Sequence, residues 1–266
     1  MLYMRIVRKI KFSIKKFLEA MSPRLLLKFR ILARRGFELE LEWLPRFCDK
    51  DRESIDIGAH WGLYSFFMVR YSKKVHAFEP NPDVFNVLKR GLGSKIKTWP
   101  YALSDYSGEC ELRIPEDEPG GATIESLNLL EEAQDYTNIK KTLVSVKRLD
   151  EFGFNNIGFI KIDVEGHEES VVRGALETIK RSRPNFLIEI EERHHAGALE
   201  KVALILKELH YLGFFLKDGR MKSLGDFDQD KHQSFENINY FGKNGEYINN
   251  FIFLDREIVK KNKNWF

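Results

Sequence analysis

A glycine-containing turn between a short apolar segment and an amphipathic one constrains the fold of this chain most. Residues 54–62 read Ser-Ile-Asp-Ile-Gly-Ala-His-Trp-Gly, and Glu79 follows 17 positions after the last glycine, at the end of a second apolar segment. Two strands joined by a helix, with glycines in the first turn and an acid after the second strand, are typical of a βαβ unit that holds a ribose-bearing cofactor.

The glycine spacing distinguishes two classes of cofactor. A dinucleotide-binding turn reads G-x-G-x-x-G and presents amides to a pyrophosphate. This turn has one glycine fewer, Gly58 and Gly62, and it contains Asp56, which would repel a pyrophosphate but not a cationic sulfonium or an amino group. We expect both glycines to let the backbone approach the ligand and Glu79 to accept hydrogen bonds from ribose hydroxyls. The turn therefore favours S-adenosylmethionine.

Apolar segments alternate with helical patterns from residue 53 onward, which predicts an α/β fold with a mostly parallel sheet. The sequence predicts seven strands, at 53–57, 74–78, 98–103, 157–163, 186–191, 214–217 and 251–254. It predicts helices at 63–71, 82–90, 168–180 and 196–211, the last ending at Gly213. A hairpin return at 109–114 and a short strand at 143–147 complete the elements. We expect a Rossmann-like domain over 37–266 that follows a helical extension over 1–36.

The first 30 residues carry nine Lys or Arg against one acid, Glu19. Apolar residues recur at helical spacing up to Met21, and a second helix is expected from Pro23 to Arg35, with Gly36 as its C-terminal stop. A basic amphipathic helix can lie on an anionic membrane surface. It can equally pack on its own domain or on a sister subunit. Peripheral membrane contact through residues 1–35 and a homo-oligomer are therefore both open.

The overall composition excludes several other classes. A net charge of +3 over 266 residues implies no nucleic-acid partner. Cys48 and Cys110 form neither a disulfide framework nor a zinc site, which favours a reducing compartment. No apolar run is long enough for a transmembrane helix, and basic residues interrupt the N-terminus where a signal peptide needs an apolar core. We expect a cytoplasmic protein.

Polar residues follow the predicted strands where their carboxyl ends meet, and these carry the expected chemistry. We expect Asp105, beside Ser104, to accept from the adenine amino group, although it could instead only start a turn. An alcohol acceptor is a weak nucleophile, and a base accelerates its reaction by roughly 10²–10⁴-fold. His167 is the first candidate for this base. Asp163 and Glu165 are alternatives, as base or as orienting partners of His167.

Two further features of the sequence bear on the site. Acids at 163–168 and 189–191, with His194 and His195 nearby, could hold a divalent ion, but their spacing is not that of a tight ligand set, so no metal is predicted. Residues 115–140 are aperiodic and rich in Gly, Pro and acids, which is typical of a functional loop such as a substrate lid or of a plain surface excursion.

Five sequence blocks together are specific enough to identify a family. They read Ile-Asp-Ile-Gly-Ala-His-Trp-Gly (55–62), Ala-Phe-Glu-Pro-Asn-Pro (77–82), Ala-Leu-Ser-Asp (102–105), Val-Lys-Arg-Leu-Asp (146–150) and Ile-Lys-Ile-Asp-Val-Glu-Gly-His-Glu (160–168). With these blocks the chain resembles the FkbM family of S-adenosylmethionine-dependent methyltransferases. It departs from the family at His60-Trp61, where Asn and a small or apolar residue are common.

The resemblance implies O-methylation of a sugar hydroxyl or another secondary-metabolite alcohol. It implies cofactor contacts at Asp56, Gly58, Gly62, Glu79 and Asp105, and we assign His60, Ser104 and Asp163, which lie in the same blocks, to the cofactor site as well. A carbohydrate, glycolipid or secondary metabolite is the expected acceptor. The alternatives are a nicotinamide-dependent oxidoreductase on the same fold and a non-catalytic cofactor-binding module, tethered to a membrane or partner by the N-terminal helices.

Overall fold

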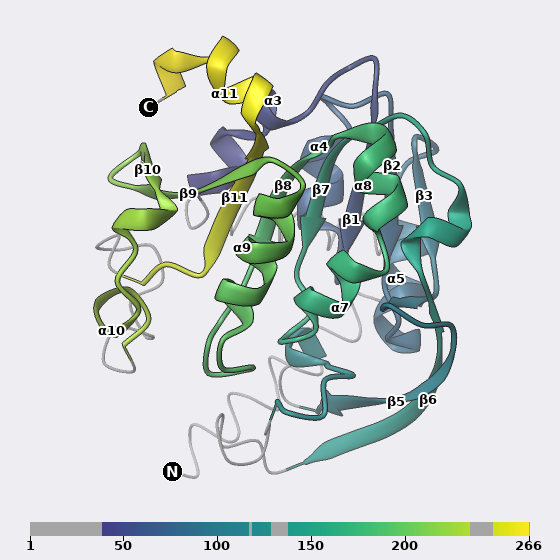
Figure 1. The fold of residues 1–266 in the computed structure, drawn as a ribbon. Coiled ribbons are helices and arrows are strands. Elements are labelled where there is room, and N and C mark those ends of the chain that lie inside the picture. Colours follow the sequence, from purple (N-terminus) through teal and green to yellow (C-terminus); the bar gives the residue numbers. More distant parts are fainter. Residues whose placement is uncertain (1–38, 117–118, 129–137, 235–246, 266) are drawn as a thin grey trace, which may run out of the picture.

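The structure is a computed structural model that describes residues 39–116, 119–128, 138–234 and 247–265 (Figure 1). The two helices and the domain extension expected within residues 1–36 lie outside these ranges. Among the described residues, no helix is both long and apolar enough to cross a membrane.

An eight-stranded sheet forms the centre of the molecule, in the order β10-β9-β11-β8-β7-β1-β2-β3. Five neighbouring strands, β8 to β3 in this order, are parallel, whereas β11 runs antiparallel to both of its neighbours and β10 runs antiparallel to β9. The strands are β1 (Glu53–Ile57), β2 (Lys74–Phe78), β3 (Ile96–Trp99), β7 (Ile157–Ile162), β8 (Asn185–Glu189), β9 (Tyr211–Lys217), β10 (Arg220–Ser223) and β11 (Asn250–Asp255).

The strand order reverses beside β1, because β2 and β3 follow on one side of it and β7 and β8 on the other. In open α/β sheets, ligands bind at such a switch point, outside the carboxyl ends of the strands. The expected Rossmann-like α/β fold is confirmed. The expectation of seven strands is wrong by one, because β9 returns through Asp218 and Gly219, both with positive φ, to form β10.

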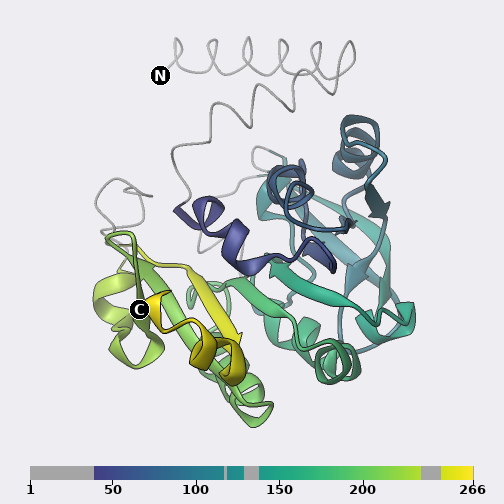
Figure 2. The same cartoon turned by 90° about the horizontal axis from the view of Figure 1, so that it is seen from above.

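Helices cover both faces of this sheet, and each face has its own apolar cluster. Ile55, Ile57 and Ile160 face α7, α8 and α9, whereas Val75 and Ala77 face α3, α4 and α5. Seen from above, α3 and α4 (dark blue) lie on one side of the sheet and α8 and α9 (green) on the other (Figure 2). The helices are α3 (Leu44–Phe47), α4 (Leu63–Met68), α5 (Pro82–Gly91), α7 (Glu168–Arg173), α8 (Leu176–Ser182), α9 (Ala198–Glu208), α10 (Gln229–His232) and α11 (Arg256–Lys261).

A separate three-stranded sheet, β4-β6-β5, corrects the expected strand at 98–103. That segment divides at Pro100: β3 ends at Trp99 in the main sheet, and β4 (Ala102–Leu103) pairs parallel with β6 (Ile139–Lys147). Proline lacks the N–H that a central strand must donate. β5 (Gly108–Pro115) also pairs with β6 rather than with the preceding strand. In Figure 1, β5 and β6 lie at the lower end of the main sheet.

Three predicted helices are shorter than expected. The helix expected at 63–71 ends at Met68, as α4. The helix expected at 168–180 is divided into two helices, α7 and α8. Asp150 accepts hydrogen bonds from the backbone N–H groups of Glu177 and Thr178 (3.1 and 2.7 Å) and thereby caps the N-terminus of α8. The helix expected at 196–211 ends at Glu208, and Gly213 lies within β9 rather than at the helix end.

Candidate active site

A cavity of about 620 Å³ lies at the carboxyl ends of β1, β2 and β7, where the strand order reverses. Ligand sites in proteins occupy roughly 300–1,000 Å³. Gly58, His60 and Glu79 line one part of the cavity, and Asp163, Glu165 and His167 line another. The three-stranded sheet and the loop between β5 and β6 contribute apolar residues to the lining: Ala102, Leu103, Leu112, Ala122 and Ile124.

Gly58 brings the turn after β1 against the turn after β7. Its φ is +75°, and a Cβ added there would lie 1.7 Å from the carbonyl oxygen of Asp163. No side chain fits at such a distance, and the left-handed conformation favours glycine. The two neighbouring turns can therefore meet only because residue 58 has no side chain, and both reach the cavity.

Main-chain donors hold the carboxylate of Glu79, which lines the cavity. It accepts hydrogen bonds from the backbone N–H groups of His60 and Asn81, both at 2.8 Å. Burial raises the pKa of Glu79 to about 7. His60 has a left-handed φ of +48°, and in this conformation its backbone N–H points at Glu79. Carboxylate oxygens have further lone pairs, so Glu79 can still accept ribose hydroxyls.

Two residues assigned to the cofactor are not among the residues that line the cavity. Asp56 is buried within β1, where it accepts hydrogen bonds from the N–H and hydroxyl of Ser65 (2.9 and 2.6 Å), so it anchors α4 instead of facing the ligand. Burial raises the pKa of Asp56 to about 6. A Cβ on Gly62 would lie 2.7 Å from Leu88, so Gly62 serves the packing of α4 against α5.

Ser104 and Asp105 also lie outside the cavity lining. Ser104 is fully buried, and its hydroxyl lies 2.9 Å from Nε2 of His167. Asp105 is exposed and accepts from the Ser104 hydroxyl at 3.2 Å. Neither residue lines the cavity, and the proposed contact of Asp105 with adenine stays a prediction.

His167 is held at both ring nitrogens. Nε2 meets Ser104, and Nδ1 lies 2.9 Å from Oε2 of Glu125, a residue in the loop between β5 and β6. This hydrogen bond from His167 lowers the pKa of Glu125 to about 2, so Glu125 stays ionised. Sequence analysis missed Glu125, because nothing in an aperiodic loop indicates which of its acids turns inward.

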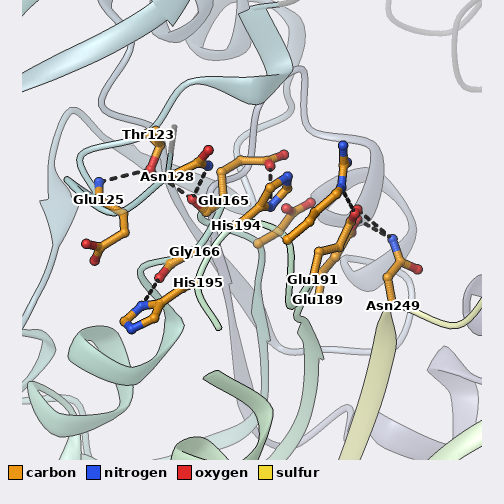
Figure 3. A network of polar contacts seen from close by, with 12 residues as sticks. Thr123, Glu125, Asn128, Glu165, Gly166, Glu189, Glu191, His194, His195 and Asn249 are labelled. Carbon is orange, nitrogen blue, oxygen red and sulfur yellow. Dashed lines mark hydrogen bonds and ion pairs between the residues drawn. The ribbon is translucent and has the colours of Figure 1, made fainter. Parts of the chain in front are cut away.

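Glu165 faces the cavity from a strained position. Its φ is +54°, and its Oε2 lies 3.1 Å from Nδ1 of His194, which is 3% exposed (Figure 3). Burial, with repulsion from Asp163 and the other acids nearby, raises the pKa of Glu165 well above its ordinary value. Burial also lowers the pKa of His194 to about 4, so His194 is neutral at cellular pH. A carboxylate whose pKa is raised in this way is a stronger base than an ordinary carboxylate.

Lys161 supplies a buried positive charge beneath the cavity. Its Nζ lies 3.4 Å from Glu189 and 3.6 Å from Asp163, and the side chain is 1% exposed. Lys161 therefore pairs with acids at the cavity. The Lys161 ammonium thereby partly compensates the negative charge of Asp163 and Glu189, which both line the cavity.

One wall of the cavity consists of polar side chains that interact with one another. Glu191 pairs with Arg193 and accepts from the Tyr247 hydroxyl at 2.6 Å. Asn249 donates to Glu189 at 2.7 Å (Figure 3). Burial opposes ionisation of Glu191, but its interactions with Arg193 outweigh burial and lower its pKa. This wall offers both donors and acceptors to a polar molecule. Within the described ranges, no group of three or more His, Cys, Asp and Glu could hold a metal ion.

Comparison with known proteins associates this geometry with methyl transfer. A family model described as the methyltransferase FkbM domain matches residues 56–216, which include the turns after β1, β2 and β7. Methyltransferase sdnD of Sordaria araneosa is 30% identical over 170 residues, 52% of this chain and 66% of sdnD. The 2-O-methyltransferase NoeI of Sinorhizobium fredii is 25% identical over 166 residues, 57% of this chain and 68% of NoeI. The matches thus span about two thirds of each relative.

Among solved structures, a methyltransferase FkbM from Methylobacillus flagellatus is similar at 15% identity with a TM-score of 0.48. The alignment covers 94% of this chain and 60% of that one.

Proposed function

This chain belongs to the FkbM family of methyltransferases, and we propose that it methylates a hydroxyl of a carbohydrate, a glycolipid or a secondary metabolite. Its methyl donor is S-adenosylmethionine, and this rules against the alternative of a nicotinamide-dependent oxidoreductase. The observation that carries the proposal is one cavity that both Glu79 and Glu165 line. The name of NoeI, a 2-O-methyltransferase, supports oxygen as the acceptor atom.

The residues at the β1–β2 end of the cavity fit the donor. Gly58 leaves room for a ligand against the backbone, and Glu79 presents a carboxylate that two main-chain N–H groups hold in place. We assign ribose binding to Glu79, and contact with the amino-acid end of the donor to His60 and Asp163. When bound, the donor supplies a methyl group that its sulfonium already activates for displacement.

We assign the proton transfer to Glu165. As the bound donor's methyl group is transferred to the acceptor oxygen, the Glu165 carboxylate would take the hydroxyl proton. His194 donates Nδ1–H to that carboxylate and fixes its direction. The raised pKa of Glu165 makes its carboxylate a stronger base than an ordinary one.

The structure favours Glu165 over the other two candidates for the base. Both ring nitrogens of His167 already have partners, so a proton could reach Nε2 only after Ser104 moves away. Asp163 is paired with the buried Lys161 ammonium at 3.6 Å, so its carboxylate is already engaged by another side chain. We therefore assign His167 to shaping the cavity and Asp163 to the donor.

A mass-spectrometric screen tests this function. The purified protein and S-adenosylmethionine are incubated with candidate glycans, glycolipids and small alcohols, and each product is examined for the mass gain of one added methyl group. We expect a gain on a hydroxyl-bearing compound that depends on Glu165. Methylation of nitrogen or carbon alone would contradict the proposal. The tethered-module alternative rests on residues 1–35, which lie outside the described residues.

A further inference from the structure

Two side chains from one loop hold the backbone of Glu165. Thr123 Oγ1 and Asn128 Nδ2 both donate to the carbonyl oxygen of Glu165, at 2.9 and 2.8 Å (Figure 3). Both donors come from the segment between β5 and β6, and both are buried, Thr123 at 1% exposure and Asn128 at 0%. Side-chain donors therefore converge from a distant segment on a single main-chain oxygen beside the cavity.

The residue held in this way has a backbone conformation that is costly for a side chain with a Cβ. Glu165 has a φ of +54°, in the left-handed region. Such conformations persist only where the surroundings enforce them, and they concentrate at functional sites. Thr123 and Asn128 fix the carbonyl, while His194 binds the carboxylate at 3.1 Å from the opposite side. The backbone and the side chain of Glu165 are thus restrained by different parts of the chain.

Asn128 does not maximise the stability of the folded protein. Its Oδ1 is buried and has no hydrogen-bond partner among the described residues. A buried polar atom without a partner destabilises the folded state, and an apolar side chain of similar size would avoid that cost. The one hydrogen bond of the Asn128 side chain to a residue lining the cavity is the bond to Glu165. Its position is therefore explained by what it does to Glu165.

We propose that Thr123 and Asn128 are positioning residues for methyl transfer, which hold the Glu165 carbonyl so that the carboxylate faces the acceptor and stays bound to His194. The proposal rests on the role of Glu165 given above. Neither residue is assigned a contact with the substrate, so their loss should lower kcat and leave donor binding intact. A misplacement of about 1 Å can reduce a rate by about 10²-fold.

The experiment compares Asn128→Leu with Leu127→Ala, a control in the same loop whose side chain is 61% exposed. Each variant is saturated with S-adenosylhomocysteine, and the ring nitrogens of His194 are observed by ¹H–¹⁵N correlation NMR. Calorimetry measures the affinity for S-adenosylhomocysteine, thermal unfolding measures stability, and kcat is measured on the acceptor found by the screen.

We expect Asn128→Leu to be at least as stable as the wild type, to bind S-adenosylhomocysteine equally well, to shift the His194 signals and to lower kcat by about 10²-fold. Leu127→Ala should match the wild type throughout. A merely structural Asn128 would lower stability and leave kcat intact in the folded fraction. Unchanged His194 signals in Asn128→Leu would overturn the proposal.

Thr123 provides an independent test if Asn128→Leu fails to fold. Thr123→Ser keeps the hydroxyl donor, whereas Thr123→Val keeps the shape and removes the donor. We expect Ser to retain kcat and the His194 signals and Val to lose both, and equal behaviour of the two variants would overturn the proposal. If Glu165→Gln is fully active while Asn128→Leu still shifts the His194 signals, the assignment of the base fails and the positioning of Glu165 stands.

Discussion

His194 Nδ1 lies 3.1 Å from Oε2 of Glu165, and this contact joins the loop after β8 to the turn after β7 at the cavity. The imidazole is buried and its pKa falls to about 4, so it acts here as a neutral donor and not as a counterion. The carboxyl is surrounded by other acids, and its pKa is well above its ordinary value. The pair therefore provides a carboxylate whose direction is fixed and whose basicity is raised by its surroundings.

Replacement of Glu165 by Gln should remove the base with little change in shape. We expect kcat on the identified acceptor to fall by roughly 10²–10⁴-fold, while the affinity for S-adenosylmethionine stays as in the wild type. Glu177→Gln, on the exposed surface of α8, is the matched control. A Glu165→Gln variant with undiminished kcat would remove Glu165 from the chemistry.

The pH dependence of the wild-type enzyme should report the same carboxyl. The base works only when ionised, and burial with neighbouring acids raises the pKa of Glu165 well above 4.5. Activity should therefore decline as the pH falls, beginning well above pH 4.5. The pH–rate profile checks this, and the residual activity of Glu165→Gln should lack this acidic decline. An identical decline in the variant would assign the titration to another group.

Gly58 should not tolerate a side chain, for two reasons: its backbone conformation and a close contact. Gly153 shares the conformation but not the contact, so it separates the two effects. Gly58→Ala combines a left-handed φ with a Cβ 1.7 Å from a backbone oxygen, whereas Gly153, with a φ of +65°, has open space within 4 Å. We expect Gly153→Ala to lose about 1–2 kcal/mol of unfolding free energy from conformation alone. Gly58→Ala should lose more than about 4 kcal/mol. Urea unfolding measures both, and equal losses would contradict the close contact between the two turns.

Glu168 should make the protein less stable as the pH rises. Burial raises its pKa from 4.5 to about 7, so the folded state holds the proton more tightly than the unfolded state does. Its contribution is fully present below pH 4.5 and is lost as the pH rises to about 7. A pKa difference of this size corresponds to about 3 kcal/mol. Glu168→Gln cannot ionise, so its stability relative to wild type should increase from pH 5 to pH 8 in urea titrations. A difference independent of pH would contradict the raised pKa.

Sequence alone predicted the parallel core, because apolar strands with their flanking turns carry strong local signals. The strands at 53–57 and 74–78 have the predicted limits, and Asn81 accepts from the N–H of Asp83 as an N-cap. The β9–β10 hairpin was missed, although Asp218-Gly219 is a favoured two-residue turn.

The site was harder to predict, because a sequence shows which residues follow a strand but not where their side chains point. Asp56 alternates with the apolar residues of β1, and its side chain faces Ser65. Its position in the sequence beside the glycine turn therefore did not indicate where its side chain points. Glu125, Asn128 and His194 come from loops without periodicity, and only the tertiary structure brings them to Glu165 and His167.

The most direct test of the account is calorimetric titration of S-adenosylmethionine into the wild type, Glu79→Ala and the exposed-surface control Glu200→Ala, each first shown to be folded. Hydrogen bonds to a charged group contribute about 1.5–3 kcal/mol, so loss of Glu79 should weaken binding by roughly 10–100-fold. The wild type and Glu200→Ala should bind alike in the micromolar range. Equal binding by Glu79→Ala would contradict a donor held at the ends of β1 and β2.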